Sequence, residues 1–151
     1  MKLPRAVLER FRQHGRAGGR ARAKRMSPAA RTSVARRAAL RRWTQVRFGE
    51  SSFEALGLPG GHLIDAGLSD LSSSVESVES LLVSLAAPRL RREGVPVPKE
   101  ILSDPEERLY RRLERTSGDL AHHRYLAYLR QAASFADACR LARRDRGRRA
   151  A

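Results

Sequence analysis

"SSVESVESLLVSLAAPRLRREG", residues 73–94, decides the fold class that the sequence predicts. Its apolar residues recur at intervals of three and four, which is typical of one face of an α-helix. They are Val75, Val78, Leu81, Leu82, Leu85 and Ala86. Ser74 is the expected N-cap and Gly94 the expected end, whereas Pro88 predicts a kink or break near Ala87. No segment of the chain alternates as a strand would, so the sequence predicts an all-α protein.

Further helices are expected on both sides of this segment. Residues 62–72 place apolar residues at helical spacing, and Asp104 followed by Pro105 is a typical helix start. A last long helix is expected from about residue 118, with a wide apolar face. These segments predict a small helical bundle over residues 61–145, used for dimerisation or partner binding, and a basic tail at 146–151.

The first third of the chain differs from the rest in charge. The protein has 151 residues and a net charge of +15. Residues 1–48 hold 15 basic residues and one acid, Glu9, whereas residues 49–151 hold 16 basic residues and 15 acids. Of the 31 basic residues, 28 are arginine, which suits bidentate phosphate contact. A GC-rich genome would also favour arginine codons, but it would not place the excess charge in one segment.

Two helical segments are expected in this basic region, and they predict a helical arm or a module resembling a helix-turn-helix. The first runs from about Leu3 and stops at Gly15, and residues 16–26 are expected to be a loop or a helix that forms on contact. The second starts at Ser27 as N-cap and Pro28 as first residue. The turn-rich residues 49–60 predict a hinge, so that 1–48 form a separate nucleic-acid-contacting module.

Residues 16–42 are the predicted nucleic-acid interface, because clustered cations gain affinity by releasing counterions from phosphate backbones. DNA is preferred to RNA as the partner. The predicted contact residues are Arg16, Arg20, Arg22, Lys24, Arg25, Arg31, Arg36, Arg37, Arg41 and Arg42.

Three alternatives to DNA binding remain open for this segment. The first is a basic protein associated with RNA or the ribosome. The second is an adaptor whose basic arm meets an acidic protein, with Val78, Leu82 and Leu85 as an exposed second contact. The third is a solvated extension attracted to any polyanion.

Catalysis, a metal site and a cofactor are not expected. The spacing of Arg115 and His122 is similar to that of the Arg and His in helical ribonucleases of the HEPN type, but among 28 arginines such spacing is common. The single cysteine, Cys139, is expected to be a buried small hydrophobe, and a reducing cytoplasm is the expected compartment. No apolar run approaches the ~18 residues of a membrane span, so no membrane partner is expected.

Two stretches resemble known groups of bacterial proteins. "GGRARAKRMSPAARTSVARRAALRRW", residues 18–43, resembles a pattern near the start of small proteins, several of them associated with mobile or plasmid-borne genes. "HLIDAGLSDLSSSVESVESLLVSLAAPRLRREGVPVP", residues 62–98, is similar to segments of proteins from toxin–antitoxin or defence-type gene modules. Together these resemblances imply a small accessory or antitoxin-like protein with a basic N-terminal arm.

Overall fold

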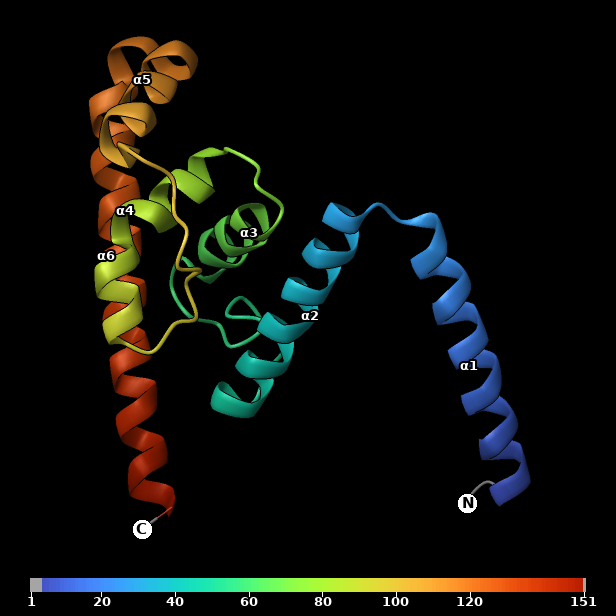
Figure 1. The fold of residues 1–151 in the computed structure, drawn as a ribbon. Coiled ribbons are helices and arrows are strands. Elements are labelled where there is room, and N and C mark those ends of the chain that lie inside the picture. Colours follow the sequence, from blue (N-terminus) through green and yellow to red (C-terminus); the bar gives the residue numbers. More distant parts are fainter. Residues whose placement is uncertain (1–3, 151) are drawn as a thin grey trace. The chain divides into compact units, whose positions relative to one another are not determined.

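The computed structural model describes residues 4–150, with side chains for residues 4–144, and within that range the chain is helical and contains no strand (Figure 1). This confirms the predicted all-α fold. The elements are α1 (Arg5–Arg25), α2 (Pro28–Phe48), α3 (Gly61–Ser72), α4 (Val78–Arg92), α5 (Pro105–Ser117), a 3-10 turn (Gly118–Leu120) and α6 (Ala121–Ala150). The chain divides into two compact units, Met1–Ala35 and Arg36–Ala151.

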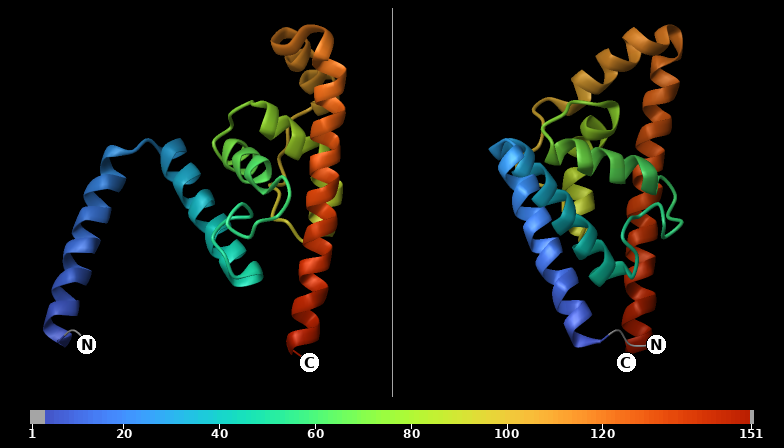
Figure 2. Two further views of the ribbon diagram at one scale, coloured as in Figure 1. Left: turned by 180° about the vertical axis from the view of Figure 1, so that it is seen from behind. Right: turned by 90° about the vertical axis from the view of Figure 1, so that its right-hand side faces the viewer.

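The second unit is built around α6, the long helix drawn in red in Figures 1 and 2. Helices α4 and α5 pack along α6, and α3 packs on α4. Two buried clusters fill the spaces between them. One includes Ile64, Leu68, Val83, Leu90, Phe135 and Cys139, and the other includes Leu63, Leu81, Leu82, Leu109, Leu113 and Ala132.

The predicted hinge at residues 49–60 is a turn segment packed inside the second unit. Phe53 is fully buried there, with its ring centroid 5.4 Å from that of Phe48 and 5.0 Å from that of Phe135. The Glu54 N–H donates to the Asp65 carboxylate at 2.9 Å, and burial raises the pKa of that carboxyl. The end of α2 thus belongs to the unit that contains α3 to α6, and the division between units falls near residue 35.

Helix α4 starts three residues later than expected and does not break at its proline. Ser77 is the N-cap: its hydroxyl accepts from the Ser80 N–H at 3.0 Å, and the Ser80 hydroxyl accepts from the Ser77 N–H at 2.8 Å. Ser74, the predicted cap, lies in the turn before it with a φ of 56°. The helix continues through Pro88 because Ala87 and Leu90, on either side, are fully buried and hold it against the core.

The remaining helix starts follow the sequence closely. Pro105 is the first residue of α5, although the side chain of Asp104 makes no capping hydrogen bond. Leu109 and Leu113 are buried, as expected, and Tyr110 is half-buried. Helix α6 continues to Ala150, so part of the predicted tail at 146–151 is helical, while its side chains lie outside the described residues.

Candidate nucleic-acid interface

Helix α1 is a single helix of 21 residues that continues through Gly15, Gly18 and Gly19. The predicted stop at Gly15 is therefore wrong, and of the two alternatives for residues 16–26, a loop or a helix that forms on contact, the loop is not found. Each glycine costs about 1 kcal/mol relative to alanine in a helix, but the alanine, arginine, glutamine and lysine around these three are good helix formers. None of the described side chains of α1 is buried.

Basic side chains form a continuous stripe along one side of α1. Arg12, Arg16, Arg20 and Lys24 follow one another at intervals of four, and each step turns by about 40° and rises about 6 Å. We call these four residues the basic stripe. Arg22 and Arg25 lie on the other side of the helix, which is also the side of the exposed Phe11 about three turns earlier. The sequence prediction omitted Arg12, although its fourfold spacing from Arg16 was the signal that would have found it.

The start of α2 is fixed as the sequence predicts, by Ser27 and Pro28. The Ala30 N–H donates to the Ser27 hydroxyl at 3.2 Å. The five predicted arginines of α2 lie on three sides of the helix, because successive residues are about 100° apart. Arg31 and Arg42 share one side, Arg37 and Arg41 share another, and Arg36 stands apart beside a pocket.

All ten predicted contact residues are exposed, and none of them forms an ion pair or a side-chain hydrogen bond with another part of the chain that the structure describes. Several arginines of α4, α5 and α6 provide the contrast. Arg89 forms an ion pair with Asp137 at 3.1 Å, and Arg111 with Glu107 at 2.5 Å. Glu76 forms ion pairs with both Arg108 and Arg112. The cations of α1 and of the N-terminal part of α2 are thus available to an external anion.

Of the three apolar residues predicted to bind a partner, one lies in the core and two are only partly exposed. Leu82 is fully buried, and Val78 and Leu85 are half-buried and pack against the cluster that contains Leu109 and Leu113. Their spacing on α4 was read correctly, but the sequence did not reveal that α5 and α6 cover this face. The adaptor hypothesis loses its second contact.

The groups considered for catalysis or metal binding make no hydrogen bond or ion pair with one another in the part of the chain that the structure describes. Arg115 lies on α5 and His122 on α6 with a 3-10 turn between them, and the Arg115 guanidinium donates to the Arg111 carbonyl oxygen at 3.4 Å. The nearest described rings to His122 are Tyr110 and His123, with centroids 6.4 and 6.3 Å away. Within the described residues, no three His, Cys, Asp or Glu side chains are placed to hold a metal ion.

Cys139 is a buried hydrophobe, as expected. Its side chain is fully inaccessible, and burial raises the pKa of its thiol to about 12. The nearby Glu93 carboxylate adds to the rise and Arg143 opposes it. A thiol in this environment is a poor nucleophile at neutral pH.

The chain was also compared with known proteins and searched for membrane-spanning helices. No family model, curated protein or solved structure matches the chain. Among the helices that the structure describes, none is both long and apolar enough to cross a bilayer.

Proposed function

We propose that the protein is a non-enzymatic DNA-binding protein of the antitoxin or autorepressor kind, and that α1 and the N-terminal part of α2 contact the DNA. The observation that carries the proposal is the set of ten exposed cations without carboxylate partners, whereas several arginines of α4, α5 and α6 pair with acids. The antitoxin part of the proposal rests on the resemblance of residues 18–43 and 62–98.

The dimensions of the helices support duplex DNA as the anion. A helix of 21 residues is about 30 Å long, close to one turn of B-DNA, and the major groove admits an α-helix. The basic stripe would follow phosphates along one strand. On α2, the side that carries Arg31 and Arg42 and the side that carries Arg37 and Arg41 would face the two walls of a groove. Dimerisation or partner binding would use the second unit, through a surface other than Val78, Leu82 and Leu85.

A fluorescence-anisotropy titration tests the proposal. The full chain is titrated with a duplex from its own promoter, a scrambled duplex and a structured RNA, each at about 50 and 200 mM salt. The test variant carries Arg16→Gln, Arg20→Gln and Lys24→Gln. A matched control carries Arg115→Gln, Arg124→Gln and Arg130→Gln, which are exposed, lie in the second unit and remove the same charge.

We expect the stripe variant to bind the promoter duplex more weakly, with a salt slope lower by about 3, since each phosphate contact contributes about 0.9. The control should keep the wild-type slope. Equal losses in the two variants would mean that only net charge matters, and would overturn the placement of the interface. A preference for the structured RNA would replace DNA by RNA, and loss of all nucleic-acid binding at 200 mM salt would favour an acidic protein partner.

A further inference from the structure

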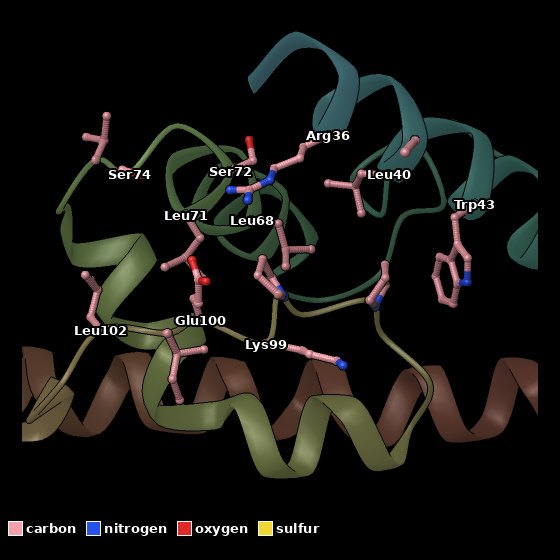
Figure 3. Close-up of a pocket in the computed structure, with 15 residues that line it drawn as sticks. Arg36, Leu40, Trp43, Leu68, Leu71, Ser72, Ser74, Lys99, Glu100 and Leu102 are labelled. Carbon is pink, nitrogen blue, oxygen red and sulfur yellow. The ribbon is translucent and has the colours of Figure 1, made fainter. Parts of the chain in front are cut away.

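The second unit contains an open pocket of about 570 Å³ beside α2 (Figure 3). Three elements supply its apolar wall: α2 contributes Leu40 and Trp43, α3 contributes Leu68 and Leu71, and the segment after α4 contributes Ile101. The volume is within the range of about 300–1,000 Å³ that is usual for small-molecule sites. Ile101 is 39 % exposed, so apolar surface at this pocket faces solvent.

The wall formed by residues 95–102 is held in place at two points. The Arg91 guanidinium donates to the carbonyl oxygen of Pro98, and the Leu102 N–H donates to the hydroxyl of the buried Ser84 at 3.3 Å. Pro96 and Pro98 also line the pocket, and proline restricts the backbone and has no N–H. The pocket is therefore formed before any ligand arrives, and this wall is poor in hydrogen-bond donors.

Charged side chains line the pocket, and their charges determine which ligand head group would fit. Arg36 and Lys99 are cationic and Glu100 is anionic, which leaves one net positive charge. Figure 3 shows Arg36 extending from α2 toward Leu71 and Ser72, whereas Lys99 extends away from these two residues. No described side chain pairs with the Arg36 guanidinium, and the Ser72 hydroxyl is already donated to the Ser69 carbonyl at 2.7 Å. Arg36 is thus the group that would meet an anion.

We propose that this pocket binds a small amphipathic anion, such as a medium-chain carboxylate, with the apolar body against Leu40, Trp43 and Leu71 and the anionic group on Arg36. Burial of the chain supplies most of the affinity, because apolar transfer scales with the area removed from water. The guanidinium supplies the selection for an anion through a charge-assisted hydrogen bond. This inference goes beyond DNA binding and does not depend on it.

The test uses Trp43, the only tryptophan of the chain, as an internal reporter. The full chain is titrated, without nucleic acid, with octanoate, 1-octanol and octylammonium, and Trp43 emission and the heat of binding are both recorded. We expect saturable binding in the order octanoate, then octanol, then octylammonium. Decanoate should bind roughly tenfold more tightly than octanoate, because two more methylenes are buried.

Three variants locate the site. Ala39→Phe fills the pocket from an exposed position of α2, so it should abolish binding of both octanoate and octanol while the urea midpoint stays near that of the wild type. Arg36→Gln should remove the preference for octanoate over octanol and leave octanol binding unchanged. Arg124→Gln, which removes the same charge from an exposed position of α6, should change neither the preference for octanoate nor the binding of octanol. No saturable heat or emission change, equal affinity for octylammonium, or unchanged binding by Ala39→Phe would each overturn the proposal.

Discussion

Cys139 shows how burial sets the chemistry of one residue. Its thiol is fully enclosed by the core, and burial raises the thiol pKa to about 12. At pH 8 we expect no reaction of the folded protein with a thiol reagent on a timescale on which the urea-unfolded chain reacts completely, because only the exposed thiolate is a nucleophile. Rapid labelling of the folded chain, with the circular dichroism spectrum unchanged, would contradict the buried position.

The raised pKa of the Cys139 thiol makes the free energy of unfolding depend on pH. The thiol of the unfolded chain titrates near 9, so above that pH the unfolded state loses its proton before the folded state does. The contribution of Cys139 to the free energy of unfolding is fully present below about pH 9 and is lost as the pH rises toward 12. Urea midpoints measured between pH 8 and 10.5 should fall more for the wild type than for Cys139→Ala. The comparison removes the effect of all other titrating groups, because they are the same in both proteins. Parallel curves would rule out the thiol as the cause.

At the scale of elements, glycine has opposite effects in α1 and α3. A Cβ on Gly67 would lie 2.3 Å from the Glu79 carbonyl oxygen and 2.5 Å from Val83 Cγ2, so the approach of α3 to α4 requires glycine. Gly18 and Gly19 have nothing within 4 Å of such a Cβ. We expect Gly67→Ala to destabilise the protein by about 1–3 kcal/mol or more, through overpacking, as measured by its urea midpoint.

Replacing glycine by alanine in α1 should favour the helix, in contrast to the destabilising Gly67→Ala. Gly18→Ala with Gly19→Ala should raise the helical signal in circular dichroism, because alanine is favoured over glycine by about 1 kcal/mol per helical position. It should also strengthen DNA binding, since less conformational entropy is lost when α1 is held on the duplex. An unchanged helical signal would mean that α1 is already fully formed, and a weaker affinity would show that the glycines permit a close approach to the DNA.

The elements were predictable from sequence where the signal is local. Ser27 with Pro28 and Asp104 with Pro105 mark helix starts through backbone geometry that needs no tertiary partner. The position of the α4 cap was missed, because Ser74 and Ser77 are chemically equivalent and only the register of the core selects Ser77. The burial of Leu82 was also missed because it depends on tertiary packing, which the local sequence does not show. An apolar stripe does not say which other helices cover it.

At the scale of the whole molecule, charge segregation was readable from composition, whereas the pocket was not. The ten cations lie outside the paired network of the second unit, as their distance in sequence from the acids suggests. The pocket joins residues 36–43, 68–75 and 96–102, which only the tertiary fold brings together. The role of Arg36 beside it could not be seen in a run of arginines that all look alike in sequence.

Arg36 gives the last prediction, because it belongs to both the proposed DNA interface and the pocket. One guanidinium cannot hold a carboxylate and a phosphate equally well at once, so the two ligands should oppose each other. We expect saturating octanoate to weaken binding of the promoter duplex about fivefold, and the duplex to weaken octanoate by the same factor, since coupling free energies are reciprocal. In Arg36→Gln the coupling should disappear although both ligands still bind. Coupling that survives in this variant would place the shared group elsewhere on α2, and a duplex affinity that saturating octanoate leaves unchanged would mean that the two ligands share no group.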